Sequence, residues 1–211
     1  AEGHQYSVES TAIRGVKLFP EREVLSAANL KANDVAGQAD ITAAEKSIRD
    51  YYGSRGYADT QVRAVKESVP GKPGRMAITY DVQEGELAYV RNIIIRGNEK
   101  TKDKVIRREV QMSPGSLMDT VKIDRNERRL KNLGYFKEVR HYTENTDKSG
   151  NRDLVYEVEE QRTGNFMVGA GISSVDSIIG FAEVSQSNFD ILNWPNFTGG
   201  GQKARAGVEV G

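Results

Sequence analysis

The sequence predicts an α+β protein made of two tandem β-α-α-β-β modules, followed by the first strands of an incomplete antiparallel transmembrane β-barrel. The main support is an internal repeat, since similarity that recurs in the same order along a chain is typical of repeated structural units. A helix-glycine-strand corner occurs in each copy, and the residue pattern changes after residue 163. The repeated landmarks are Arg14-Gly15 with Arg96-Gly97, Gly56-Tyr57 with Gly134-Tyr135, and Tyr80-Asp81-Val82 with Tyr156-Glu157-Val158.

The composition excludes several classes of function. The 211 residues carry 30 basic and 30 acidic side chains, so no net charge favours nucleic acid, an anionic membrane surface or an acidic substrate. The absence of cysteine excludes disulfides, thiolate zinc sites and cysteine nucleophiles. No apolar run reaches the roughly 18 to 20 residues of a membrane helix, and the N-terminus lacks a signal-peptide pattern. We therefore expect a chain that is either cytosolic or cut from something larger.

The first module is expected over residues 3–86. It opens with a strand at Tyr6–Arg14, and a helix follows near Pro20–Ala28. Thr42 and Glu45 have the spacing of a capping box, which predicts that a second helix begins there. The closing strand places alternate residues on one face, namely Met76, Ile78, Tyr80 and Val82.

The second module is expected over residues 87–162 and begins with an apolar strand at Tyr89–Arg96. Thr101 is a candidate cap for a short helix, and Asp119 is a candidate cap for a longer one. The expected buried side chains are Val105, Ile106 and Val110 in the short helix, and Ile123, Leu130 and Leu133 in the long one.

A glycine ends the long helix of the second module. Gly134 follows the last apolar helical residue and can adopt the left-handed conformation that closes a helix. The next strand is expected at Lys137–Glu144, and the last strand follows a loop at 147–151 and puts Leu154, Tyr156 and Val158 on one face. Each module is therefore expected to form one sheet covered on one face by two helices.

Residues 163–211 have a different pattern. Apolar residues alternate with small or charged ones in two stretches, Phe166–Ile172 and Lys203–Val210. Such strands suit a barrel wall with one face toward lipid and the other toward a wet lumen. Trp194 and Phe197 lie beside a turn, as in an interfacial aromatic girdle. Because membrane barrels need at least about eight strands, we expect only the start of a barrel, with an open sheet edge.

Several motifs resemble one family. Together they are similar to the polypeptide-transport-associated (POTRA) module nearest the barrel in BamA-type outer-membrane assembly factors. Residues 3–86 resemble the preceding module, although Lys17–Pro20 departs from its usual opening, and residues 164–211 resemble the first barrel strands. The motifs that carry the resemblance are Asn92–Asn98, Thr101–Glu109, Pro114-Gly115 and Arg129–Val139.

The resemblance implies a scaffold in the periplasm, joined to a barrel in the cell outer membrane, that works without covalent chemistry. Its implied partners are unfolded outer-membrane proteins, accessory assembly lipoproteins and, through the barrel of the full-length protein, outer-membrane lipid. Two other functions stay open. A two-partner secretion transporter or another translocase would export one dedicated substrate, and a soluble periplasmic adaptor would use the modules without a barrel.

Two strands are candidate binding edges. Gln61–Val69 and Lys137–Glu144 are charged along their length, and a small sheet with an exposed edge can bind an extended peptide by β-augmentation. The same charges keep a solitary edge from aggregating, so a protected edge without a ligand explains the pattern equally well. The candidate client-binding residues are Val62, Arg63, Ala64 and Val65 in the first strand, and Lys137, Val139, Arg140, His141 and Tyr142 in the second.

Charged residues opposite the apolar faces of the two helices in the second module form a second candidate surface. Most such charges are simply solvated helix faces. The family resemblance adds the alternative that accessory lipoproteins dock there. The candidate docking residues are Arg107, Arg108, Glu109, Arg125, Arg128 and Arg129.

No catalytic residue, cofactor or metal site is expected. His4 and His141 are the only histidines, and neither has a partner at metal-ligand or triad spacing, so both are expected to be solvated. The segment 199–203 lacks the GK[ST] ending of a phosphate loop and is better explained as a strand turn. Aromatic residues do not alternate with a basic patch, so nucleic-acid binding is not expected. The carboxylates that line one strand without converging on a pocket are Asp153, Glu157, Glu159 and Glu160.

Overall fold

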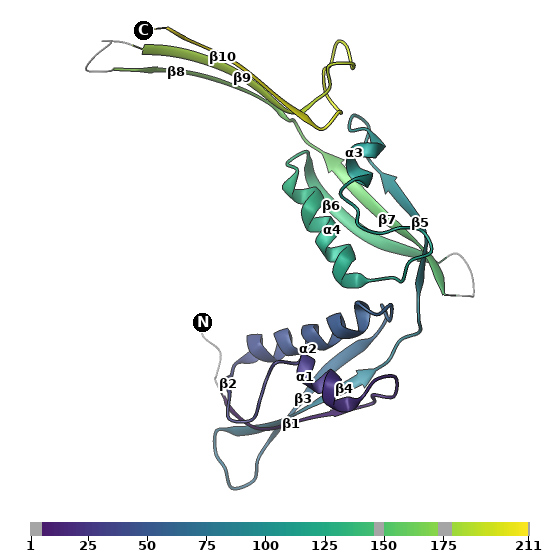
Figure 1. The fold of residues 1–211 in the computed structure, drawn as a ribbon. Coiled ribbons are helices and arrows are strands. Elements are labelled where there is room, and N and C mark those ends of the chain that lie inside the picture. The colour runs from purple at the N-terminus through teal and green to yellow at the C-terminus, as the bar shows by residue number, and fades with distance from the viewer. Residues whose placement is uncertain (1–5, 146–149, 173–178, 211) are drawn as a thin grey trace. The chain divides into compact units, whose positions relative to one another are not determined.

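The computed structural model describes residues 6–145, 150–172 and 179–210. These residues form ten strands and four helices in the order β1-α1-β2-α2-β3-β4-β5-α3-α4-β6-β7-β8-β9-β10 (Figure 1). The chain divides into two compact units, one of Ala1–Arg91, Pro114–Lys122 and Asn145–Arg152, the other of Asn92–Ser113, Ile123–Glu144 and Asp153–Gly211. None of the helices in the described ranges is long and apolar enough to cross a membrane. His4 and most of the loop expected at 147–151 fall outside the described residues.

The first sheet contains four strands in the order β2-β1-β4-β3. The central strands β1 and β4 are parallel, and the outer strands β2 and β3 each pair with a central strand in antiparallel fashion. Helices α1 and α2 pack on one face of this sheet (Figure 1). The elements are β1 (Tyr6–Arg14), α1 (Glu21–Ala27), β2 (Val35–Ala36), α2 (Gln38–Gly53), β3 (Gln61–Ser68) and β4 (Arg75–Gln83).

Two details of the first module differ from the prediction. The two-residue strand β2 was not expected, because so short a pairing leaves no periodic pattern in the sequence. The predicted helix start at Thr42 and Glu45 was wrong, because α2 already begins at Gln38. Asp40 accepts a hydrogen bond at 2.8 Å from the backbone N–H of Gly37, which satisfies a donor at the true helix start.

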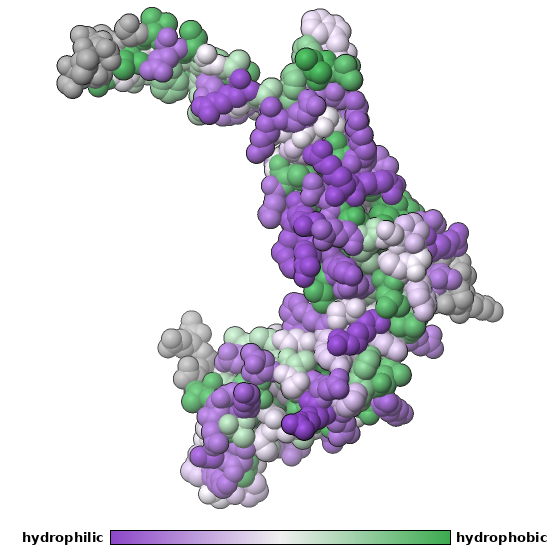
Figure 2. Space-filling view, viewed as in Figure 1, coloured by the Kyte–Doolittle hydropathy of each residue, from purple (hydrophilic) through white to green (hydrophobic). Residues whose placement is uncertain are grey.

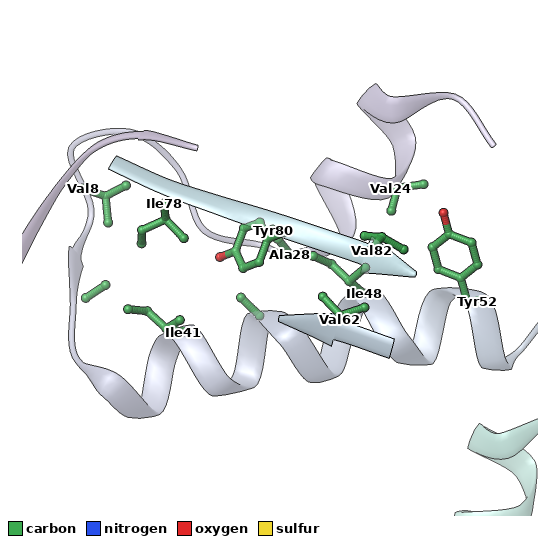
Figure 3. Close-up of a cluster of buried hydrophobic side chains, with 12 residues drawn as sticks. Val8, Val24, Ala28, Ile41, Ile48, Tyr52, Val62, Ile78, Tyr80 and Val82 are labelled. Atoms are coloured by element: carbon green, nitrogen blue, oxygen red, sulfur yellow. The ribbon is translucent and has the colours of Figure 1, made fainter. Parts of the chain in front are cut away.

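The first core lies between α1, α2 and the sheet. Ile41 and Ile48 of α2 point toward Ile78 and Tyr80 of β4 (Figure 3). All four side chains are at most 3% exposed. Burying an aliphatic side chain of this size stabilises a fold by about 1.5–3 kcal/mol, so this layer is a main source of stability for the module.

Aromatic side chains form a packed cluster at the end of α2, where the first of the predicted helix-glycine-strand corners lies. The ring of Phe19 makes edge-to-face contacts with Tyr51, Tyr52 and Tyr57 at centroid distances of 5.4, 5.3 and 5.7 Å. The Arg55 guanidinium lies 3.7 Å from the centroid of the Tyr51 ring. Aromatic pairs of this geometry contribute about 0.5–1.5 kcal/mol beyond their buried area, so Phe19 holds the opening loop of the module against the end of α2.

The second sheet has three strands in the order β5-β7-β6. The prediction of Asp119 as a helix cap is confirmed, because its carboxylate accepts a hydrogen bond from the Lys122 N–H at 3.0 Å. Gly134 has a φ of 71° and closes the second helix as predicted. The elements are β5 (Tyr89–Arg96), α3 (Asp103–Arg107), α4 (Thr120–Asn132), β6 (Phe136–Asn145) and β7 (Asn151–Glu160).

Three predictions about the helices of this module need correction. Thr101 is not a helix cap, since α3 begins after Lys102 and no side chain caps it. Val110 and Leu133 lie just beyond the ends of α3 and α4 and are only half-buried. The predicted core residues Ile123 and Leu130 are buried within α4.

The repeat predicted from sequence has a structural basis at equivalent positions. Gly15 and Gly97 have φ values of 84° and 83°, and an added Cβ at each would overlap the carbonyl oxygen of Val82 or Val158. Glu84 accepts hydrogen bonds from the backbone N–H groups of Lys17 and Leu18. In the second copy Glu160 accepts the equivalent bonds from the backbone N–H groups of Lys100 and Thr101. Both modules therefore have the same two features near their start, a glycine packed against a carbonyl oxygen and a carboxylate that binds two backbone N–H groups.

The third sheet is antiparallel, in the order β10-β9-β8. The register places Phe166 beside Val184 and Val184 beside Ala206, so the apolar residues of all three strands share one face. The opposite face carries the ion pair of Glu183 with Arg205. Hydrophobic residues are visible along this sheet (Figure 2), and the predicted two-faced strand pattern is confirmed. The strands are β8 (Gly164–Gly171), β9 (Ile179–Phe189) and β10 (Gln202–Val210).

Candidate functional site: free sheet edges and a docked turn

Strand β3 is an edge of the first sheet, since it stands last in the strand order and pairs with β4. In an antiparallel pair, the backbone groups of alternate residues point toward the partner strand and away from it. Val69, just after β3, donates to the Arg75 carbonyl at 3.2 Å, so odd-numbered residues face β4. The backbone groups of Val62, Ala64 and Lys66 therefore face outward, where an added strand would bind.

Side chains from α2 reach this edge. The carboxylate of Glu45 accepts a hydrogen bond from the Ala64 N–H at 2.6 Å. The Lys66 ammonium donates to the side-chain oxygen of Gln38, also at 2.6 Å. Glu45 lies in the middle of α2 rather than at its start, and for that reason it contacts the strand instead of capping the helix.

Tyr80 lies opposite Ala64 in the register and is fully buried. Its hydroxyl has no hydrogen-bond partner among the described residues. Burial, with a smaller effect from the negative charge of Glu45, raises the pKa of Tyr80 to about 12. The hydroxyl is therefore a neutral, unpaired polar group below the β3 edge.

Strand β6 is an edge of the second sheet. Of the predicted client-binding residues on it, only Val139 is buried; Lys137, Arg140 and Tyr142 are exposed. Each of these three polar side chains has a partner within the chain. The contacts are Lys137 with Glu159 at 2.9 Å, Arg140 with Glu138 at 2.6 Å, and the Tyr142 hydroxyl with Arg96 at 2.8 Å.

His141 was expected to be a solvated side chain, and that expectation was wrong. It is half-buried, with 30% of its side chain exposed, and its Nδ1 contacts the Glu127 carboxylate of α4. Burial favours a higher pKa for Glu127, but hydrogen bonds from Lys131 and His141 outweigh it and hold the pKa below the ordinary value. The edge strand and the long helix are thus tied by a charged contact in this module as well.

The predicted arginine surface is divided in the structure. Arg107 pairs with Asp103 at 2.9 Å and donates to the Ile93 carbonyl, while Arg108 donates to the Gly201 carbonyl at 3.3 Å. Glu109 lies 3.5 Å from Arg108. These residues are therefore engaged within the chain.

The arginines of α4 differ from one another. With the Gln111 amide oriented so that its oxygen faces Arg129, the two groups are 2.8 Å apart. Arg125 and Arg128 are exposed, and neither side chain bonds to any residue that the structure describes. Arg125 and Arg128 are thus the candidate docking residues whose guanidinium groups contact only solvent within the described ranges.

The end of β9 and the turn that leads to β10 pack onto the second module, a contact that the sequence analysis did not predict. We call residues 188–201 the docked turn. The buried amide of Asn188 donates to the Thr101 hydroxyl at 2.9 Å and accepts from the Gly201 N–H at 2.8 Å. The Asp190 carboxylate pairs with Lys102, whose backbone N–H donates to the Gly199 carbonyl at 2.9 Å.

Glycine is required in the docked turn because of close approach. Gly199 has a φ of 107°, and a Cβ there would overlap the Lys100 carbonyl oxygen. A Cβ on Gly201 would lie 2.7 Å from Val105 of α3. The sequence contains a signal for this, since three consecutive glycines stand between two strands, but it does not indicate which surface they approach.

These features define the class of protein. It has two related α+β modules, each ending in a free strand edge, and a two-faced antiparallel sheet fastened to the second module. The chain belongs to the POTRA family, described as surface antigen variable number repeat, which matches residues 6–85 and 88–161. It is a POTRA region of the BamA type, and such modules are the periplasmic parts of outer-membrane proteins.

Comparisons with individual proteins agree with this family. The chain is 26% identical over 177 residues to the outer membrane protein assembly factor BamA of Nitratidesulfovibrio vulgaris, covering 82% of this chain and 22% of the relative. It is 29% identical over 193 residues to BamA of Neisseria meningitidis serogroup B, covering 89% and 24%. The chain thus spans less than a quarter of the length of these curated relatives.

The fold comparison extends to the third sheet. The crystal structure of BamA from Haemophilus ducreyi lacking POTRA domains 1-3 superposes with a TM-score of 0.79 at 23% identity. The match covers 97% of this chain and 37% of that one. Two POTRA-like modules followed by strands of an incomplete barrel, the predicted fold class, are therefore confirmed.

Proposed function

We propose that this chain is the periplasmic region and barrel start of an outer-membrane β-barrel assembly factor. It binds nascent outer-membrane proteins and aids their folding and insertion. The relatives named above are called assembly factors, and the observation that carries the proposal is the free edge strand on each of two consecutive modules. We assign residues 3–86 and 87–162 to the two modules and residues 163–211 to the barrel start.

Client binding proceeds by β-augmentation on β3 and β6. The outward backbone groups of Val62, Ala64 and Lys66 offer alternating donors and acceptors to an extended chain. Each such bond contributes about 0.5–1.5 kcal/mol net and depends little on side chains, which suits a factor with many clients. The step breaks no covalent bond, in keeping with a non-enzymatic role. Within the described ranges no group of acidic or histidine side chains could hold a metal ion.

Cross-linking in the cell tests this function. The chain has no cysteine, so a single cysteine at Arg63 of β3 or Arg140 of β6 in the full-length protein would be unique within residues 1–211. We expect disulfides to many different outer-membrane proteins that carry a cysteine in a barrel strand. A cysteine at the exposed residue Arg22 of α1 is the matched control and should give none. Products from one exported protein alone would favour a dedicated secretion transporter, and no product at either edge would refute the binding mode.

Accessory lipoproteins are proposed to dock on α4. Arg125 and Arg128 are exposed and bond to no residue in the part of the chain that the structure describes, and their spacing of three residues places them on neighbouring positions of one helix face. Such a pair suits an acidic partner surface. Replacing both by glutamate should abolish co-purification of the accessory proteins, whereas Arg22→Glu in α1 should not. Unchanged co-purification by the double variant would remove the basis for this docking site.

A further inference from the structure

We propose that Glu45 is a built-in competitor for the client-binding site on β3, so that an extended chain can dock there only after the Glu45 side chain moves away. This inference rests on the proposed β-augmentation and adds a residue that controls it. The observation behind it is the hydrogen bond from the Ala64 N–H to the Glu45 carboxylate.

The carboxylate occupies the place of an incoming backbone carbonyl. The outward-facing residues of β3 are Val62, Ala64, Lys66 and Ser68, so the Ala64 N–H is an inner donor of the edge, with outward-facing residues on both sides of it. A strand added to β3 would need this donor at about 2.9 Å. Two acceptors cannot both bind one N–H in good geometry, so docking exchanges the Glu45 contact for the client contact.

The exchange has a route that leaves the module intact. Glu45 is half-buried on α2, whose neighbouring residues Ala44 and Ile48 remain in the core. Rotation of the Glu45 side chain alone returns its carboxylate to water. The bond lost is charge-assisted and therefore stronger than a neutral one, so the first step of docking is opposed.

The same carboxylate favours some clients over others. A client strand that carries an aspartate or glutamate opposite Ala64 would bring two negative charges together, which disfavours its binding. Client strands with a neutral or basic residue opposite Ala64 avoid this repulsion and bind more tightly. No equivalent contact to a backbone donor is made by Glu127 in the second module, where the described contacts of this carboxylate are with side chains, those of His141 and Lys131.

The experiment uses the full chain in detergent micelles with one cysteine at Arg63 on β3, or at Arg140 on β6. The probe is a peptide with the sequence of β10, Gln202–Val210, followed by a cysteine. Disulfide formation is measured against peptide concentration. We expect Glu45→Ala to lower the half-saturating concentration for cross-linking on β3 by about ten- to a hundredfold, the effect of removing one competing hydrogen bond to a charged group. Cross-linking on β6 should stay unchanged.

Two further variants sharpen the test. Asp50→Ala removes another acidic side chain of α2, one that pairs with Lys46 and does not contact the β3 edge. This variant should change the cross-linking of neither β3 nor β6. Glu45→Gln keeps the shape but loses the charge, so it should give a smaller gain even if the alanine variant folds poorly. In each Glu45 variant the Ala64 amide should exchange with solvent faster than in the unaltered chain.

The outcomes separate the two proposals. Cross-linking on β3 that is unchanged or weakened by both Glu45 variants would overturn the role of Glu45 and leave the proposed function standing. Absence of cross-linking on β3 and β6 in every variant would overturn both. Cross-linking on β3 that appears only after Glu45 is replaced would support the competitor strongly.

Discussion

Replacement of Asn188 by alanine tests whether the docked turn fastens the third sheet to the second module. Asn188 is 2% exposed, and its amide bonds to the Thr101 hydroxyl and the Gly201 N–H. In the alanine variant the buried Thr101 hydroxyl and the half-buried Gly201 N–H both lose their hydrogen bond to the Asn188 side chain. Each unsatisfied buried group costs about 1–3 kcal/mol, and Gly201 can recover a bond to water. We therefore expect a local loss of about 2 kcal/mol.

Hydrogen exchange measures this loss at a reporter outside the mutated residue. The Lys102 N–H donates to the Gly199 carbonyl, so it exchanges only when the docked turn opens. A loss of about 2 kcal/mol corresponds to an increase in exchange rate of about thirtyfold. Asn196→Ala is the matched control, because Asn196 is an exposed asparagine of the same turn. In the Asn196→Ala variant the Lys102 amide should exchange at the same rate as in the unaltered chain.

One result would refute the reasoning. If the Lys102 amide exchanges equally slowly in Asn188→Ala and in the unaltered chain, Asn188 does not hold the turn. The ion pair of Asp190 with Lys102 and the close packing of Gly199 against the Lys100 carbonyl would then be sufficient to hold the turn in place.

Three further predictions concern the modules themselves. Gly97→Ala should destabilise the second module by more than 2 kcal/mol in chemical denaturation, because a Cβ would overlap a carbonyl of β7 at a positive φ; a change below about 0.5 kcal/mol would contradict this. Tyr80→Phe should leave the denaturation midpoint of the first module unchanged or raise it, because the hydroxyl is buried and has no partner among the residues that the structure describes; a lowered midpoint would contradict this. The pKa of Glu127 is lowered in the folded state despite burial, by Lys131 and His141, so its stabilising effect is present above about pH 4.5 and is lost as the pH falls through the folded pKa. Glu127→Gln should flatten this acid-side slope, and an unchanged slope would show that other carboxylates cause it.

The fold was predictable because its signals are local or repeated. Gly15 and Gly97 stand out in the sequence as paired landmarks, and the structure shows that both are required by the approach of a carbonyl oxygen. Gln61–Val69 and Lys137–Glu144 were expected at sheet edges because they are charged along their length, and the strands found there, β3 and β6, are edge strands. Each of these signals can be recognised in the sequence from a single residue or a single strand, without knowledge of the contacts between elements.

The candidate site was less predictable because its contacts join residues far apart in sequence. Glu45 fits a helix-start pattern with Thr42, and only the observed length of α2 shows that it lies beside Ala64. Asn188 and Thr101 are separated by most of the second module and meet through side-chain atoms alone. Periodicity indicates which face of an element is buried, but it does not show which side chain crosses to a neighbouring element.

The docked turn also has a mechanical consequence. Strand β9 ends within it and β10 begins directly after it, and at Gly199 the turn lies so close to the Lys100 carbonyl that a Cβ would not fit. A force along either strand is therefore transmitted to Thr101 and Lys102, the residues that lead into α3, through their contacts with Asn188 and Asp190. Strain in this sheet would reach the second module through these contacts as well as along the chain segment 161–163 that connects β7 to β8.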